Sequence, residues 1–409
     1  MALNAPISAA TATAERANGN TRFAFFLVTS LFFMWGLSYG LLDVLNKHFQ
    51  ETLQVSRAKS ALLQAAYFGA YFLMAMPAAA LMNRKGYKTG ILLGLFLFAA
   101  GALLFIPATT AGQFEFFLFA LFVIASGLAC LETAANPYVT FLGPPERSEQ
   151  RLNLSQSFNG LGQFVGPLIG GAVFFGGGGN NQGGVQAIYV AIAAVVVVIA
   201  VLVARTPMPY IHEETVSAHG VSVRPLRAQR HLLYAVVAQF FCVAAQVGVG
   251  AFFINYVTEH AHGISSQNAS YLLSVGMLCF LGGRFLGTAL MGRIAPATLL
   301  ATYALINVAL SLVVVAGAGL VSVIALIAIF FFMSIQFPTI FALGVKNLGV
   351  HTKRGASFII MAIVGGAIVP YFMGLLADHY STAVSYLIPA ACFAVVAWYG
   401  RYGYQLDEH

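Results

Sequence analysis

Long apolar stretches dominate the pattern of this chain, and short polar segments separate them. An α-helix needs about 20 apolar residues to cross a ~30 Å hydrocarbon core. On this criterion the sequence predicts twelve spanning helices, so we expect an all-α polytopic membrane protein. The expected ranges are 22–45, 58–81, 88–108, 114–141, 152–175, 185–204, 231–257, 267–290, 296–317, 320–344, 354–376 and 383–402.

Composition supports this class. Hydrophobic residues make up 59% of the chain and charged residues only 8%, whereas soluble domains carry about 25% charged residues. Such a chain has too little polar surface to cover a soluble globule. Its four cysteines have no metal-ligand spacing, so we expect them to pack as small apolar residues. We therefore expect neither a metal site nor a bound cofactor.

Basic residues are distributed unevenly between the two sides of the expected bundle. One side holds both termini and most of the 20 Lys and Arg residues, while the other side holds only Lys47, Arg57 and Lys59. The positive-inside rule predicts that the basic side is cytoplasmic. This bias accounts for the net charge of +7, so the charge does not indicate a nucleic-acid partner. We expect a monomer in a bacterial-type cytoplasmic (inner) membrane, surrounded by lipid.

A polar segment at 205–230 divides the spans into six and six, and related motifs recur on either side of it. LMNR at 81–84 returns as LMGR at 290–293. The recurrence predicts an internal duplication, with one half at 22–204 and the other at 231–402. The remaining predicted parts are a disordered N-terminus at 1–21, a cytoplasmic linker at 205–230 and a cytoplasmic tail at 403–409.

Three ionisable residues lie well inside the expected spans, where a charge costs ~2.5–3.5 kcal/mol. Glu132 shares a helix face with Asn136, four residues later. It either binds and releases a proton or is held by structural hydrogen bonds. Asp43 is either a coupling group or a cap near a helix end. Arg284 is expected to snorkel, to pair with a carboxylate or to act in gating, rather than to contact substrate.

Amide side chains form a second polar stripe, in RLNLSQSFNGLGQFVGP at 151–167. Positions i, i+3 and i+7 of this stripe share one helix face. They either bind substrate or join helices by hydrogen bonds. Amides with one carboxylate suit sugar hydroxyls, because each hydroxyl donates and accepts, and aromatic rings suit the apolar face of a sugar. The predicted substrate-binding residues are Glu132, Asn136, Gln156, Asn159, Gln163, Gln64, Gln246, Trp35 and Tyr67.

The loop NRKGYKTG at 83–90 resembles the basic loop that major facilitator proteins carry between spans 2 and 3. Arg84 and Lys85 are therefore expected to act in gating. The alternative interpretation is positive-inside charge alone.

The chain from about 21 to 401 resembles the fucose–galactose–glucose:proton symporter family of the major facilitator superfamily. The most specific stretch is CLETAANPYVTFLGPPERSEQRLNLSQSFNGLG at 130–162. The resemblance implies the major facilitator fold with two pseudo-symmetric six-helix halves. It also implies sugar binding and protonation at Glu132, proton coupling at Asp43, and sugar contacts from Gln156 and Asn159.

Departures from the fucose transporters surround Asp43, where this chain carries Tyr39, Gly40 and Leu42. Gln163 is an added amide. These departures favour glucose, galactose or a related hexose over fucose.

We therefore predict a secondary active transporter that couples the uptake of a neutral hexose to a cation, by alternating access. The predicted cation is a proton. One alternative is a sodium-coupled symporter with Asp43 as a ligand, and another is a proton-driven drug exporter. An enzyme is not expected, because no nucleophile–base set, metal spacing or phosphate-binding loop lies in or beside the spans.

Overall fold

The computed structural model describes residues 21–142, 148–176, 182–207, 229–261, 263–346, 348 and 352–405, and these residues form helices without strands. The predicted N-terminal segment 1–21, the linker 205–230 and the tail 403–409 lie largely outside the described part.

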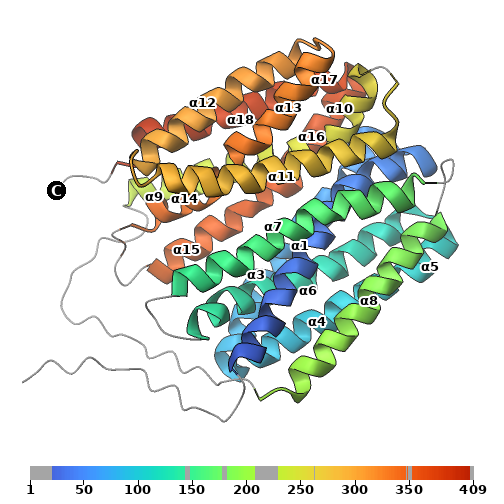
Figure 1. The fold of residues 1–409 in the computed structure, drawn as a ribbon, viewed down its shortest axis with the longest axis vertical. Helices are drawn as coiled ribbons and strands as arrows, with labels where there is room; N and C mark the ends of the chain where they lie inside the picture. Colours follow the sequence, from blue (N-terminus) through green and yellow to red (C-terminus); the bar gives the residue numbers. More distant parts are fainter. Residues whose placement is uncertain are drawn as a thin grey trace, which may run out of the picture.

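The helices follow the predicted spans in order (Figure 1). The earlier helices are α1 (Thr21–Thr52), α2 (Arg57–Ser60), α3 (Leu62–Lys85), α4 (Tyr87–Leu103), α5 (Phe105–Ala111), α6 (Phe114–Phe141), α7 (Ser148–Phe174) and α8 (Gln182–Arg205). The later ones are α9 (Arg230–Ala251), α10 (Phe253–His260), α11 (Ser266–Leu290), α12 (Pro296–Val315), α13 (Leu320–Met333), α14 (Gln336–Gly344), α15 (Thr352–Met361), η4 (Ala362–Val364), α16 (Gly365–His379), α17 (Thr382–Ser385), α18 (Leu387–Trp398) and η5 (Tyr399–Gly403).

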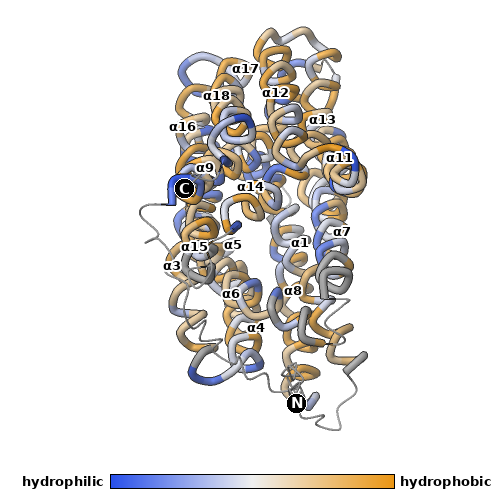
Figure 2. Tube along the Cα trace, turned by 90° about the vertical axis from the view of Figure 1, so that its left-hand side faces the viewer, coloured by the Kyte–Doolittle hydropathy of each residue, from blue (hydrophilic) through white to orange (hydrophobic). Residues whose placement is uncertain are grey.

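The described residues contain 11 helices that are long and apolar enough to cross a membrane. The predicted span that is not among these 11 is the fifth, at 152–175, which corresponds to α7 and is made more polar by its amide stripe. The 27 residues of α7 extend over about 40 Å at ~1.5 Å per residue, which is enough to cross a bilayer core. Apolar residues dominate the helices along their lengths (Figure 2).

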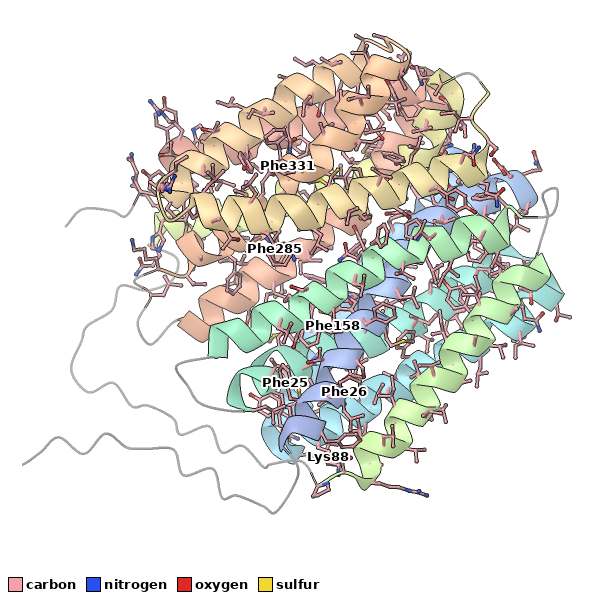
Figure 3. The ribbon with its side chains drawn as sticks, in the orientation of Figure 1. Phe25, Phe26, Lys88, Phe158, Phe285 and Phe331 are labelled. Atoms are coloured by element: carbon pink, nitrogen blue, oxygen red, sulfur yellow. The ribbon has the colours of Figure 1, made fainter. Side chains whose placement is uncertain are left out.

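Large apolar side chains also lie on the outside of the bundle, among them Phe26, Phe158 and Phe285 (Figure 3). Such an extended apolar exterior is what a lipid-facing surface requires.

Helices α1–α8 form one group and helices α9–α18 form another (Figure 1). The two groups meet where α7 lies along α11 and where α16 packs against α2 and α3. The exact boundary of the two halves at 205–230 stays a prediction, because residues 208–228 lie outside the described part.

Helices α1 and α7 pack closely against each other, and glycines make the approach possible. A Cβ atom on Gly36 would lie 2.0 Å from the backbone oxygen of Asn159, and one on Gly162 would lie 2.3 Å from the backbone oxygen of Phe33. Only hydrogen fits at these positions, as in other membrane helix pairs that cross through small residues. The crossing therefore places the amide stripe of α7 directly against α1.

We expect Gly36→Ala to lower the apparent Tm of the detergent-solubilised protein, measured by size-exclusion chromatography after heating. The added methyl group must push the helices apart, and overpacking of this kind costs about 1–3 kcal/mol. Gly282→Ala is the matched control, because a Cβ atom there meets nothing within 4 Å. Equal Tm values for the two variants would contradict the proposed role of the crossing.

Candidate functional site

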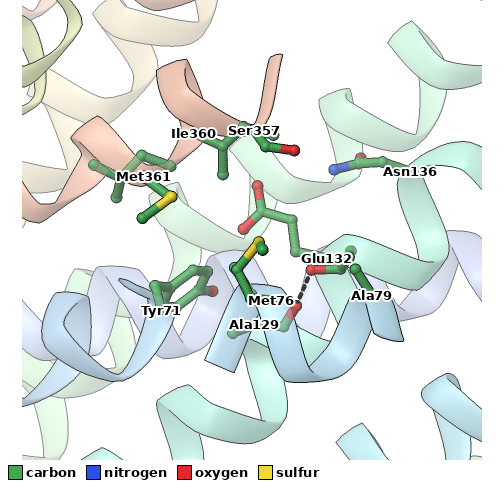
Figure 4. Close-up of a pocket in the computed structure, with 12 residues that line it drawn as sticks. Tyr71, Met76, Ala79, Ala129, Glu132, Asn136, Ser357, Ile360 and Met361 are labelled. Carbon is green, nitrogen blue, oxygen red and sulfur yellow. Dashed lines mark hydrogen bonds between the residues drawn. The ribbon is translucent and has the colours of Figure 1, made fainter. Parts of the chain in front are cut away.

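A cavity of about 260 Å³ lies between the two groups of helices (Figure 4). This volume is near the lower end of the ~300–1,000 Å³ typical of small-molecule sites. The lining comes from α3, α6, α15 and η4, and consists of Tyr71, Ala75, Met76, Ala79, Ala129, Glu132, Thr133, Asn136, Ser357, Ile360, Met361 and Ile363. Because α3 continues from these residues to Arg84 and Lys85, the cavity lies toward the basic end of the bundle.

Among the described residues that line the cavity, Glu132 is the one carboxylate. It is half-buried, and its side chain projects into the space between Tyr71 and α15 (Figure 4). The neighbouring Thr133 hydroxyl donates to the backbone oxygen of Ala129 at 2.7 Å, the bond dashed in Figure 4. Glu132 is thus a single acidic group in a mainly apolar cavity.

The amides of α7 form hydrogen bonds that reach the cavity wall. Gln156 donates through Nε2 to Oδ1 of Asn136 at 3.1 Å. Gln163 donates to Oδ1 of Asn159 at 2.7 Å, and Asn159 donates to the backbone oxygen of Phe32 at 3.2 Å. The bonds to Asn136 of α6 and to Phe32 of α1 join helices, whereas the bond between Gln163 and Asn159 lies within α7. Each amide has capacity for more than one bond. Only Asn136 of this set lines the cavity.

Asp43 lies outside the cavity. Its side chain is only 1% exposed, and α1 continues for nine more residues to Thr52, so Asp43 does not cap a helix end. A Cβ atom on Gly250 of α9 would lie 2.5 Å from its Oδ2 atom. Among the described residues, neither carboxyl oxygen has a hydrogen-bond partner. Because an unpaired buried charge is very costly, this packing suits the protonated form.

Four further predicted substrate residues lie away from the described cavity. Gln64 and Tyr67 are buried, and Trp35 and Gln246 are half-buried. The Trp35 ring packs 5.9 Å from that of Phe32. Their predicted contact with substrate stays a prediction.

Arg284 makes contacts within the α9–α18 group. Its Nε atom donates to the backbone oxygen of Ser334 at 3.5 Å, and its guanidinium lies 4.9 Å from the centre of the Phe280 ring. The geometry is compatible with a structural or gating role.

The basic loop lies at the end of α3, where Arg84 and Lys85 are exposed. Lys88 donates to the backbone oxygens of Ala204 and Thr206 at 3.0 and 2.9 Å (Figure 3). The loop is thereby attached to the end of α8.

At the opposite end, Arg57 joins the two groups of helices through Glu259 and Asp378; we call these three residues the clasp. The Asp378 carboxylate also accepts the backbone N–H groups of Arg57 and Ala58 at 3.0 and 2.9 Å. In the described part of the chain, both ion pairs between the groups involve Arg57. The clasp therefore closes the end of the bundle that lies away from the cavity.

Amides beneath the clasp reinforce this closure. Gln50 of α1 and Asn255 of α10 donate to each other's side-chain oxygen. Asn46 donates to the backbone oxygen of Ala251 at 3.0 Å. Both contacts are between α1 and the helices that follow the linker, so closure extends inward from the clasp toward Asp43.

Several of these residues were not identified from the sequence. Tyr71 follows Tyr67 by one helical turn, and this spacing could have indicated it. Ser357 and Met361 of the cavity and Asp378 of the clasp depend on contacts between distant segments, which no local pattern shows.

The profile of the Major Facilitator Superfamily matches residues 24–363. The chain belongs to this superfamily. Among its relatives, the L-fucose-proton symporter of Escherichia coli (strain K12) is 40% identical over 404 residues, covering 92% of each chain. The glucose/galactose transporter of Brucella abortus is 36% identical over 409 residues, covering 98% of this chain and 99% of that protein. These relatives confirm the resemblance to the fucose–galactose–glucose:proton symporter family.

Solved structures confirm the fold. The transporter FucP in the outward conformation is 39% identical, with a TM-score of 0.70 over 94% of this chain and 99% of that one. The xylose transporter of E. coli in an inward open conformation shares the fold at 11% identity, with a TM-score of 0.75 over 95% and 97% of the two chains.

We expect Arg57→Gln to increase the population in which the clasp end is open, by roughly 5- to 30-fold, because a charge-assisted hydrogen-bond set contributes about 1–2 kcal/mol. Spin labels at Gln54 and Tyr380, both exposed at that end, report the distance between the two groups.

The matched control is Lys59→Gln. Lys59 pairs with Glu115 at 3.0 Å at the same end, but within the α1–α8 group. An identical distance distribution for Arg57→Gln and Lys59→Gln would show that the clasp does not hold this end closed.

Proposed function

We propose that this protein is a proton-coupled symporter that takes up a neutral hexose by alternating access. The observation that carries the proposal is Glu132, a lone carboxylate in a cavity between the two groups of helices. The relatives named as an L-fucose-proton symporter and a glucose/galactose transporter support it. A polytopic transporter with bacterial relatives of this kind is an inner-membrane protein.

The chemistry of the cavity suits a sugar with a proton. A carboxylate and the Asn136 amide can exchange hydrogen bonds with hydroxyl groups. Tyr71, Met76 and Met361 offer an apolar wall to the carbon skeleton. When Glu132 is protonated, the cavity carries no buried charge and the bundle can change conformation at lower cost. Asn159, Gln156 and Gln163 then hold Asn136 and α7 in position.

The direction of the cavity follows from the proposed orientation. With the basic end and both termini in the cytoplasm, the cavity faces inward and the clasp faces outward. The described state is then the one that releases sugar and proton to the cytoplasm. Arg84, Lys85 and Arg284 are proposed to act when the cytoplasmic side closes.

We expect proteoliposomes to accumulate a labelled hexose under an inward proton gradient. The measurement is a panel of glucose, galactose, fucose and N-acetylated hexoses, each tested under separate proton and sodium gradients. Uptake that follows sodium and ignores pH would favour sodium coupling through Asp43. Export of lipophilic cations without sugar binding would favour the drug-exporter alternative.

We expect Glu132→Gln to abolish gradient-driven uptake, because an amide cannot bind and release the coupled proton. The control is Glu115→Gln, which makes the same substitution on the same helix at an exposed ion pair with Lys59. Full gradient-driven uptake by Glu132→Gln would show that the proton site is assigned wrongly.

A further inference from the structure

Three buried hydroxyl groups lie near the two membrane carboxyls, and none has a hydrogen-bond partner in the part of the chain that the structure describes. They belong to Ser38 of α1 and to Tyr67 and Tyr71 of α3. A buried polar group without a partner costs about 1–3 kcal/mol, and native structures rarely leave one unexplained. Three such groups in one region therefore indicate a role beyond packing.

The tyrosines lie on one stripe of α3. Gln64, Tyr67 and Tyr71 occupy positions i, i+3 and i+7, which share a helix face. Gln64 accepts a hydrogen bond at 3.5 Å from Asn46, which follows Asp43 by one turn of α1, and Tyr71 lines the cavity that contains Glu132. From Gln64 to Tyr71 the stripe rises about 10 Å at ~1.5 Å per residue. The stripe thus extends from the region of Asp43 to the region of Glu132, and Tyr67 lies between its ends.

Ring contacts order the groups along this stripe. The Tyr67 ring stacks on that of Tyr71 at 5.5 Å and lies 6.4 Å from that of Tyr39. Tyr71 lines the cavity that contains Glu132, and Tyr39 precedes Asp43 by one turn of α1. Tyr67 is thus in ring contact with a close neighbour of each carboxyl.

We propose that Tyr67 couples the protonation states of Asp43 and Glu132. The inference rests on the proposed function as a proton symporter. A phenol hydroxyl both donates and accepts a hydrogen bond, so it can serve whichever carboxyl is ionised.

In a transfer, the oxygen of Tyr67 accepts the proton that Asp43 releases and gives its own proton to the oxygen of Tyr71. The Tyr71 hydroxyl gives its proton to the Glu132 carboxylate. Each O–H bond that breaks is replaced by one that forms, and both tyrosines end neutral. The net result is an ionised Asp43 and a protonated Glu132.

The groups that surround Tyr67 are compatible with this role. Titratable side chains from four helices lie around Tyr67. They are Asp43 and Tyr39 of α1, Tyr71 of α3, Glu132 of α6 and Tyr189 of α8. The competing interpretation is that Tyr67 only fills space, because its side chain is 1% exposed and packs against Phe68 at 5.2 Å. A phenylalanine keeps that packing and removes only the hydroxyl.

The test is Tyr67→Phe in the full chain, reconstituted in proteoliposomes. Two rates are compared: uptake driven by a proton gradient, and counterflow, which needs no net proton movement. We expect their ratio to fall at least about tenfold, a threshold set below the ~10²–10⁴-fold that positioned proton-transfer groups typically contribute, and the pH profile of uptake to change. The control is Tyr399→Phe, at a buried tyrosine of η5 whose hydroxyl also has no hydrogen-bond partner among the described residues. It should leave the ratio unchanged.

A ratio and pH profile equal to those of the parent protein would overturn the inference, and so would a proportional loss of both rates in a folded variant. Should Tyr67→Phe fail to fold, a fluorinated tyrosine at position 67 keeps the shape and makes the phenol more acidic. The pH profile must then shift if Tyr67 relays protons, and an unshifted profile contradicts it. Absence of proton-driven uptake in the parent protein itself would instead refute the proposed function.

Discussion

The contact on which the rest of the structure depends is the close crossing of α1 and α7. Gly36 and Gly162 bring the two backbones together, and no side chain separates them. On its other side, α7 packs against α11, and a Cβ atom on Gly171 would overlap the Ser270 hydroxyl. One helix is therefore held against both groups. This fixes the height of its amides relative to the cavity, and it gives the two groups a shared element about which they can move.

The packing of helices α1–α8 against helices α9–α18 closes the bundle at one end and leaves the cavity at the other. The clasp residues are partly exposed to solvent. Ion pairs of this kind stabilise the closed end by only about 0.2–1 kcal/mol each. A closure built from a few of them is weak enough to reverse during a transport cycle. Beneath it, the α9 backbone at Gly250 covers Asp43 without offering its carboxyl a hydrogen bond. A closed clasp end and an ionised Asp43 are thus energetically opposed, and this opposition can link proton binding to the movement of the helices.

Most of the helical architecture could be predicted from the sequence, because the thickness of a bilayer imposes a length on every apolar run. The differences occur at helix ends: α1 extends to Thr52 rather than ending near residue 45, and several spans contain short breaks. Glu132 and Asn136 were identified together because one helical turn separates them and both resemble a family motif. Arg57 stood out in the sequence only as a rare basic residue on its side, since its partners Glu259 and Asp378 lie more than 200 residues away.

The sequence by itself determined which segments enter the membrane and which polar residues go with them. Both are local properties, set by apolar length and by the cost of a charge in hydrocarbon. Only the tertiary structure decided which of those polar residues share a space. It placed Glu132 in a cavity with Ser357 and Met361, and it buried Asp43 under Gly250, away from that cavity. Helical periodicity gives the face on which a residue lies but not the helix that the face meets, so the separation of the two carboxyls, with Tyr67 between them, depends on packing across the whole bundle.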